Sequence, residues 1–295
     1  ASVPLFISVD QEGGRVSRLK APFSAFPQPG CLGKARSELL AQRFGLALGR
    51  EMATVGINMV YAPVLDVNTN PKNPIIGTRA LSDDPEWAAR LGKAVIDGIS
   101  NTGVLPVGKH FPGHGDTDRD SHLELPYVNR DTNSLEKIEL KPFIEAVNNG
   151  LEVIMTAHVI YSAWDNELPA TFSPHILKNI LREKLGFDGL IITDDLEMKA
   201  VEKYISFDAI PRLGLAAGVD LYLICHYREK ILALQDQMIR DIEVGHIDKE
   251  SVERSVQRII DIKKRIAINP RNKQNLTELV QGHLNLIEEM HSYSL

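Results

Sequence analysis

Cysteine is scarce in this sequence. Its 295 residues include only two, Cys31 and Cys225, which lie far apart in the chain. Two distant cysteines argue against a disulfide framework and fit either a reducing compartment or simple packing in a core. No charged segment followed by a long apolar stretch stands at the start of the sequence, so we find no signal peptide and expect a cytoplasmic protein.

Long apolar runs and charge of one sign are missing as well. The longest apolar runs have the length of strands, which predicts no membrane-spanning segment and no membrane partner. The 33 Lys+Arg and 39 Asp+Glu are interspersed and give a net charge of −6, so no basic surface for nucleic acid is expected. With 43% hydrophobic residues, the chain can bury a large core in one domain or two.

Segments with the periods of strands and helices alternate along the chain. The expected strands are apolar runs at residues 5–10, 57–62, 104–107, 152–157, 190–193 and 219–224. The expected helices lie at residues 35–55, 84–100, 133–149, 173–185, 208–217, 228–244 and 249–266. Ser82 or Asp83 would cap the second helix, and Asn133 or Ser134 the third. The alternation predicts a parallel sheet covered by helices, which we assign to residues 1–268, with residues 269–295 as a helical tail packed on its outside.

Polar residues recur where the expected strands end. They are Asp10, Asp66, Lys109–His110, His158 and Asp194. Polar groups at the carboxyl ends of parallel strands are typical of a TIM-type (β/α)8 barrel, and a doubly wound sheet is the alternative. No G-x-G-x-x-G phosphate loop is present, which weakens that alternative. We count about six strands against the eight of a closed barrel, which predicts a barrel without its first β/α unit.

The most unusual segment is the loop at residues 109–126, with the sequence KHFPGHGDTDRDSHLELP. It concentrates three histidines and three aspartates directly after an expected buried strand. Long loops mounted at strand ends usually carry function. Within it, Asp120 and His122 form D-S-H, and an extended backbone would place their side chains on one side. A carboxylate-supported imidazole suits a general acid/base, and an ordinary surface histidine is the alternative.

A metal is a competing use of the same loop. The four candidate ligands are His110, His114, Asp116 and His122, whose spacing could form a mononuclear hydrolase site. However, no H-x-H or H-E-x-x-H pair stands on a regular element, and a glycine-rich loop is a flexible support. We therefore expect no metal and no cofactor, and we expect His114 to brace the loop.

The second chemical candidate is Asp194-Asp195 in GLIITDDLEM, at the end of an expected buried strand. Two adjacent acids can have different roles. One can project into a site, while the other caps the next helix or accepts hydrogen bonds from the backbone. Asp10 also ends a strand and could accept hydrogen bonds from vicinal hydroxyls of a sugar. A salt bridge between Asp10 and Arg15 is the alternative to that role.

Five segments of the chain match a known family. VDQEGGRVSRL, YAPVLDV, KHFPGHGDTDRDSHLELP, AHVIYSAWD and FDGLIITDDLEM closely resemble the bacterial β-N-acetylglucosaminidases (β-hexosaminidases) of glycoside hydrolase family three. The resemblance runs from Val9 to about Ile266. Its most specific part is K-H-F-P-G-H-G followed by D-S-H, because the β-glucosidase branch generally lacks the D-S-H loop. Family members carry a leading strand and helix before D-Q-E-G-G, and their absence here would leave a gap in the barrel beside the last strand.

The resemblance implies a role for each matching residue. Asp194 would be the catalytic nucleophile, His122 the general acid/base and Asp120 its partner, while Asp195 would be structural. The residues that would hold the non-reducing N-acetylglucosamine are Asp10, Arg18, Arg79, Lys109 and His110.

The resemblance also implies a reaction. It is a retaining, exo-acting hydrolysis that passes through a covalent glycosyl-enzyme and releases terminal β-linked N-acetylglucosamine, from peptidoglycan fragments (muropeptides) in cell-wall recycling. We expect a small-molecule sugar as the only partner, no cofactor, and a monomer. Three alternatives remain open: a β-glucosidase, a glycoside phosphorylase of the same family, and a sugar-binding barrel without catalysis.

Overall fold

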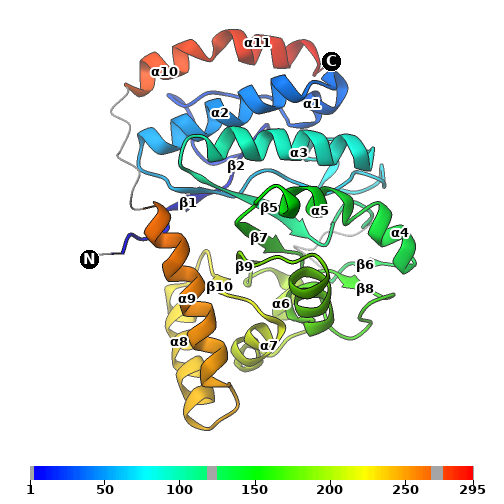
Figure 1. Ribbon diagram of the computed structural model, residues 1–295, viewed down its shortest axis with the longest axis vertical. Coiled ribbons are helices and arrows are strands. Elements are labelled where there is room, and N and C mark those ends of the chain that lie inside the picture. Colours follow the sequence, from blue (N-terminus) through cyan, green and yellow to red (C-terminus); the bar gives the residue numbers. More distant parts are fainter. Residues whose placement is uncertain (1–2, 118–124, 267–274, 295) are drawn as a thin grey trace.

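A six-stranded parallel sheet forms the centre of the molecule (Figure 1). The computed structural model describes residues 3–117, 125–266 and 275–294. The strands, in spatial order, are β1 (Ser8–Val9), β4 (Met59–Val60), β5 (Leu105–Phe111), β7 (Val153–Thr156), β9 (Leu190–Asp195) and β10 (Leu221–Leu223). Two small pairings lie outside this sheet: β2 (Gln11–Gly13) with β3 (Val16–Ser17), and β6 (Tyr127–Val128) with β8 (Ile160–Tyr161).

Helices follow the strands almost everywhere along the chain. The α-helices are α1 (Gly30–Ala35), α2 (Glu38–Thr54), α3 (Pro85–Ser100), α4 (Thr132–Lys137), α5 (Lys141–Asn148), α6 (Lys199–Glu202), α7 (Ile210–Ala217), α8 (Arg228–Glu243), α9 (Lys249–Ile266), α10 (Leu276–Gly282) and α11 (Leu284–Ser292). Four further segments wind more tightly or more loosely: η1 (Gly77–Arg79), η2 (Ala170–Phe172), η3 (His175–Lys184) and η4 (Phe207–Ala209). In the part of the chain that the structure describes, no helix has the length and apolar character that a bilayer crossing needs.

The two faces of the sheet are distinguished by the alternation of side chains along each strand. Leu105 and Val107 of β5 belong to an apolar cluster built from alternate residues of neighbouring strands, and Ile262 of α9 packs against it. Ile154 of β7 and Ile191 of β9 point the other way and join a second cluster with residues of α5 and η3. One face therefore packs on itself and on α9, and helices cover the other.

This arrangement confirms the predicted parallel α/β fold in its coarser form. The sheet is curled and helix-covered, as in part of a TIM-type (β/α)8 barrel. Within the described residues, β1 and β10 are the two ends of the sheet and do not pair with each other, so a closed eight-stranded barrel is not found.

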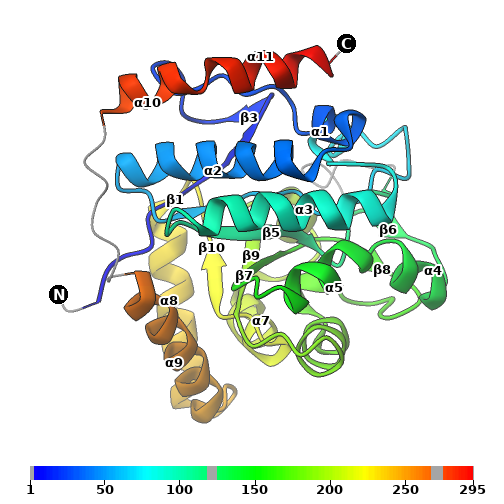
Figure 2. The same cartoon turned by 45° about the horizontal axis from the view of Figure 1, so that its top comes forward.

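The C-terminal helices α10 and α11 lie along the outer side of α2 (Figure 2). Leu286 and Met290 of α11 join the apolar cluster of α2 and α3. A buried hydrogen bond of 2.8 Å links His283 Nδ1 to Glu51 Oε1 in α2. The division into residues 1–268 and 269–295 stays a prediction, because the boundary falls outside the described residues.

The predicted helix at residues 133–149 is wrong in one respect, because the structure has two helices there. Asp131 caps α4 by accepting a hydrogen bond from the Ser134 backbone N–H at 3.0 Å, so neither predicted cap was right. α4 ends at Lys137, and α5 begins at Lys141 with Pro142 in its first turn. Proline has no backbone N–H and suits a first turn rather than a helix interior, which explains the break.

The predicted caps of α3 are also one or two residues early. Asp84 Oδ1 accepts hydrogen bonds from the backbone N–H groups of Glu86 at 2.8 Å and Trp87 at 3.2 Å, so Asp84 is the cap. Ser82 instead accepts from the Asp84 N–H. Pro85 follows the cap, the position where a helix tolerates proline best.

Candidate active site

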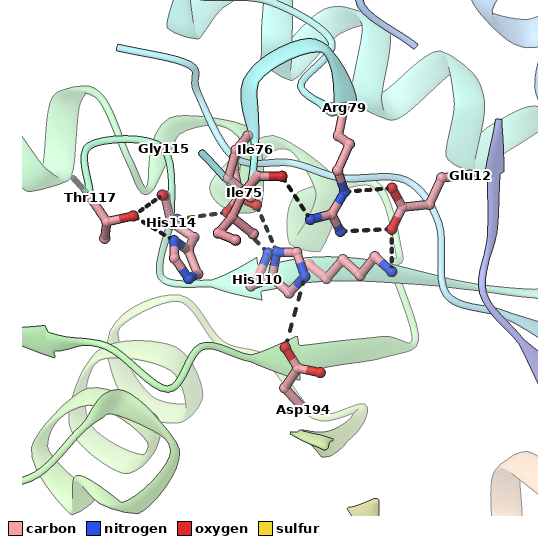
Figure 3. A network of polar contacts seen from close by, with 12 residues as sticks. Glu12, Ile75, Ile76, Arg79, His110, His114, Gly115, Thr117 and Asp194 are labelled. Carbon is pink, nitrogen blue, oxygen red and sulfur yellow. Dashed lines mark hydrogen bonds and ion pairs between the residues drawn. The ribbon is translucent and has the colours of Figure 1, made fainter. Parts of the chain in front are cut away.

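Polar side chains from several strand ends converge at one end of the sheet (Figure 3). Asp10 follows β1, Lys109 and His110 belong to β5, and Asp194 belongs to β9. Lys109 Nζ is 2.7 Å from Asp10 Oδ1, and His110 Nε2 is 4.0 Å from Asp194 Oδ2. The structure therefore brings together four of the residues that the sequence predicted for the site.

The end of β5 is irregular, and this irregularity is what places two consecutive side chains in the site. In a regular strand, Lys109 and His110 would point to opposite faces. Here the pairing of β5 with β7 shifts register between Gly108 and Phe111. Both side chains reach polar partners at the rim of the sheet.

Glu12 links two cations in the interior of the site. Its carboxylate accepts hydrogen bonds from Arg79 Nε and Nη2, both at 2.8 Å, and lies 2.6 Å from Lys109 Nζ. The Glu12 and Lys109 side chains are only 1% and 2% exposed. Burial would raise the pKa of Glu12, but Lys109 and Arg79 outweigh it and hold that pKa at about 2. Burial would likewise lower the pKa of Lys109, and Glu12 and Asp10 raise it instead.

Asp66 joins the end of β5 to the loop that follows it. Its side chain is fully buried, with Oδ2 at 2.7 Å from His110 Nδ1. Oδ1 accepts hydrogen bonds from the backbone N–H of His110 at 3.1 Å and of His114 at 2.7 Å. Burial would raise the pKa of Asp66, but these partners, His110 above all, lower it. Asp66 is therefore a carboxylate anchored by three donors.

The loop after β5 packs closely on the segment after β4. His114 Nδ1 hydrogen-bonds Thr117 Oγ1 at 2.8 Å, and burial lowers the pKa of His114 to about 4. A Cβ on Gly115 would stand 1.6 Å from the Val67 carbonyl oxygen, so only glycine fits there. His114 is thus neutral and braces the loop, as the sequence suggested.

Asp194 is a partly exposed carboxylate next to His110, with 24% of its side chain accessible. Its Oδ1 accepts a hydrogen bond from the Asp195 backbone N–H at 2.8 Å, which leaves Oδ2 turned towards His110. Burial would raise the pKa of Asp194, whereas His110, His158 and that N–H lower it. The result is an ionised carboxylate that a ligand can reach.

The neighbouring acid, Asp195, holds backbone. Its Oδ1 accepts a hydrogen bond from the Glu197 N–H at 3.1 Å. Its carbonyl oxygen lies 3.2 Å from His158 Nε2, and since a carbonyl only accepts, that nitrogen carries the proton. Burial lowers the pKa of His158, so its ring is a neutral support for the turn after β9. The two adjacent acids face different partners, as the sequence suggested.

The metal ligands considered from the sequence do not converge in the described residues. His110 and His114 pack ring against ring at 5.9 Å, and each Nδ1 has a partner of its own. Over residues 3–117, 125–266 and 275–294, the group whose ligand atoms lie close enough for a cation is instead Asp195, Glu197 and His226. The Glu197 carboxylate already accepts hydrogen bonds from three backbone N–H groups of residues 225–227, which gives it a structural role.

The remaining predicted residues have different outcomes. Arg79 is buried on Glu12, whereas Arg18 is exposed and, among the described residues, its guanidinium makes no hydrogen bond or ion pair. The alternative salt bridge between Arg15 and Asp10 is wrong, because Arg15 donates to the carbonyl oxygens of Pro74 and Ile75. Asp120 and His122 lie outside the described residues.

Sequence reasoning assigned no role to Glu12 or Asp66. Glu12 lies within the short strand β2 and Asp66 follows β4, and both are buried against cations or a histidine. The available signal was the position of Asp66 after an apolar run, and of Glu12 next to two glycines. Neither signal says which cation the carboxylate meets, because Arg79 and Lys109 come from distant parts of the chain.

A buried acid also lies beneath the loop. Glu139 has no exposed surface, and within the described residues neither of its carboxylate oxygens accepts a hydrogen bond. Arg130 Nε stands 3.4 Å from Oε1, while Arg130 Nη2 donates to Asp116 Oδ1 at 2.7 Å. Burial raises the pKa of Glu139 to about 7 against the lowering effect of Arg130.

This pKa predicts that Glu139→Gln stabilises the protein in a pH-dependent way. The folded protein holds a proton on Glu139 up to about pH 7, whereas the unfolded chain loses it near the ordinary glutamate pKa of 4.5. Stability is therefore lost as pH rises from 4.5 to 7. We expect the variant to raise the free energy of unfolding by about 2 kcal/mol at pH 8 and by much less at pH 5. Urea unfolding at both values measures it, and an equal difference at the two pH values would contradict the assignment.

The chain was compared with known proteins and structures. Residues 1–262 match the model of the glycosyl hydrolase family 3 N-terminal domain. A beta-hexosaminidase of Tolumonas auensis is 41% identical over 239 residues, which cover 80% of this chain and 71% of that protein. A beta-hexosaminidase of Haemophilus influenzae is 40% identical over 240 residues, covering 80% and 68%.

A solved structure shares the fold over nearly the whole chain. It is a glycoside hydrolase family 3 β-N-acetylglucosaminidase from a Paenibacillus species, with a TM-score of 0.91 and 39% identity. The match covers 98% of this chain and 56% of that one, so this chain spans little more than half of that protein's length.

Proposed function

The chain belongs to glycosyl hydrolase family 3, and we propose that it is a β-hexosaminidase that releases terminal β-linked N-acetylglucosamine with retention of configuration. The observation that carries the proposal is the Asp194 carboxylate. It is ionised, partly exposed and oriented by a backbone N–H and by His110. An oriented carboxylate at the end of a barrel-type strand is what attack on an anomeric carbon requires.

The polar side chains around Asp194 are suited to binding a sugar. Asp10 is 32% exposed and offers Oδ2 to a hydroxyl, while Oδ1 pairs with Lys109. The Lys109 ammonium has three N–H donors and is already within 2.7 Å of two carboxylates, so its position and charge are fixed before a ligand arrives. These groups support the predicted binding of hydroxyls by Asp10, Lys109 and His110.

The acid/base role falls to His122 with Asp120, on the loop that Asp66 and His114 anchor at its start. In the first step Asp194 attacks the anomeric carbon, and His122 gives its proton to the leaving oxygen. In the second step His122 takes a proton from water, whose oxygen displaces Asp194 and leaves the sugar in its original β configuration. An imidazole has an ordinary pKa near 6.5, so it serves both steps near neutral pH without a large perturbation.

The substrates proposed are N-acetylglucosaminides, including the muropeptide fragments of peptidoglycan, in a cytoplasmic recycling role. The names of the relatives support the sugar, and the D-S-H motif supports this branch of the family over β-glucosidases. A phosphorylase of the same family would use the same nucleophile and replace water by phosphate.

We expect wild-type protein to hydrolyse p-nitrophenyl β-N-acetylglucosaminide and to form the β-anomer of free N-acetylglucosamine first. Proton NMR during turnover reports the anomer, and parallel reactions contain phosphate or a chelator. Free sugar at an unchanged rate in every arm supports the proposal. Sugar 1-phosphate in the phosphate arm would identify a phosphorylase, and loss of activity with the chelator would identify a metal enzyme. Faster turnover of the matched glucoside would identify a β-glucosidase, and binding without turnover a sugar-binding barrel.

A further inference from the structure

Asp66 supports a residue of the site but is itself shielded from any ligand. It follows β4, has no exposed surface, and lies behind His110 as seen from Asp194. We propose that Asp66 is a positioning residue, which fixes the proton of His110 on Nδ1 and the orientation of the ring, so that Nε2 faces the Asp194 carboxylate. The inference rests on the proposed function, in which Asp194 is the nucleophile.

The first step of the argument is the position of the ring protons. An ionised carboxylate can only accept, so the 2.7 Å contact between Asp66 Oδ2 and His110 Nδ1 requires a proton on Nδ1. The other nitrogen, Nε2, points to Asp194 Oδ2 at 4.0 Å (Figure 3). The hydrogen bond to Asp66 therefore fixes both the proton on Nδ1 and the direction in which Nε2 points.

The second step is what that orientation does in the reaction. The ring of His110 faces the Asp194 carboxylate at 4.0 Å, beside the place where the sugar must lie during attack. Because Asp66 Oδ2 holds Nδ1 and its proton, Nε2 keeps a fixed position next to the nucleophile in both steps. Asp66 thus supports the reaction without touching substrate.

The two oxygens of Asp66 have separable tasks, which makes the inference testable. Oδ1 holds the backbone N–H groups of His110 and His114, and Oδ2 holds the ring. Asparagine keeps an oxygen for the backbone but presents an NH₂ to Nδ1, so Nδ1 must become an acceptor. A purely structural role would survive Asp66→Asn and fail in Asp66→Ala.

Other titratable groups surround His110 and are unchanged in both variants. Those facing it or coupled to its partners are His114 from the loop after β5, Asp194 from β9, Arg79 from η1, Lys109 from β5 and His158 after β7. With these held constant, a change in which ring nitrogen of His110 carries the proton reports the loss of the Asp66 carboxylate.

The kinetic test compares Asp66→Asn with Asp220→Asn. Asp220 is equally buried and pairs with Arg182 at 2.7 Å, but it precedes β10 and lies at the other end of the sheet. We expect Asp66→Asn to lower kcat for the aryl N-acetylglucosaminide by about 100-fold, with KM changed by less than about threefold. Asp220→Asn should keep kcat. A wild-type kcat in Asp66→Asn would overturn the inference.

A second measurement does not depend on the substrate. Long-range ¹H–¹⁵N spectra report which imidazole nitrogens carry protons, and a His110→Gln variant assigns the signals. We expect Nδ1 of His110 to carry a proton in the wild type. In Asp66→Asn we expect the proton to be on Nε2 and Nδ1 to be unprotonated. Identical His110 spectra in the two proteins would overturn the inference. If the wild type proves inactive on N-acetylglucosaminides, the proposed function fails while this result still decides the role of Asp66.

Discussion

Asp194→Ala is expected to lower kcat for p-nitrophenyl β-N-acetylglucosaminide by roughly 10⁵-fold, because it removes the group that forms the covalent intermediate. The fold should remain intact, since within the described residues the Asp194 side chain accepts a single local hydrogen bond, from the Asp195 N–H. Steady-state rates and thermal unfolding of the two proteins measure both expectations.

Added azide supplies the sharper control. In Asp194→Ala it can attack the anomeric carbon from the side that the carboxylate has vacated, which forms the α-glycosyl azide and releases p-nitrophenol. His122→Ala is the matched variant. It should lose about 100-fold on the p-nitrophenyl substrate and little on a dinitrophenyl one, whose leaving group needs no proton. A wild-type rate in Asp194→Ala, or azide rescue that yields only the β-glycosyl azide, would contradict the assignment of Asp194 as the nucleophile.

Glu12→Gln is expected to lower the free energy of unfolding by about 3 kcal/mol at pH 7, because it leaves the buried charges of Arg79 and Lys109 without their shared partner. The pKa of Glu12 in the folded protein, about 2, lies below the ordinary glutamate pKa of 4.5. Its contribution is therefore present above pH 4.5 and is lost as pH falls towards 2. Urea unfolding should show the gap between wild type and variant narrowing by about half at pH 3.

The control for this prediction is an exposed pair. Glu289→Gln removes the partner of Arg43, where both side chains are 42% exposed, and should change the free energy of unfolding by no more than about 1 kcal/mol. A Glu12→Gln effect as small as that one, or one independent of pH, would show that Glu12 is not the carboxylate that neutralises the site.

Much of the fold was predictable because apolar runs and helical periods are local properties. Each of the six expected strands corresponds to a strand of the sheet, and the helix at Lys249–Ile266 was predicted with its observed limits. Asp10, Lys109, His110 and Asp194 were likewise found from position alone, since the carboxyl ends of neighbouring parallel strands meet at one rim.

What the sequence left open depends on contacts between distant residues or on irregular backbone. The ion pair of Glu12 with Arg79 joins residues 67 positions apart, and no local pattern records it. A regular strand would send Lys109 and His110 to opposite faces, so their shared site follows only from the register shift in β5. The break at Pro142 was readable, but the apolar period continued across it and concealed the boundary between α4 and α5.

The polar contacts around the site also determine its charge balance. Glu12 and Asp10 offset Arg79 and Lys109, whereas two further carboxylates, Asp66 and Asp194, share a single imidazole. At least one unit of net negative charge therefore remains next to the anomeric carbon. This charge stabilises the bound, neutral sugar only slightly. It stabilises the transition state more, because the sugar ring then carries positive oxocarbenium character.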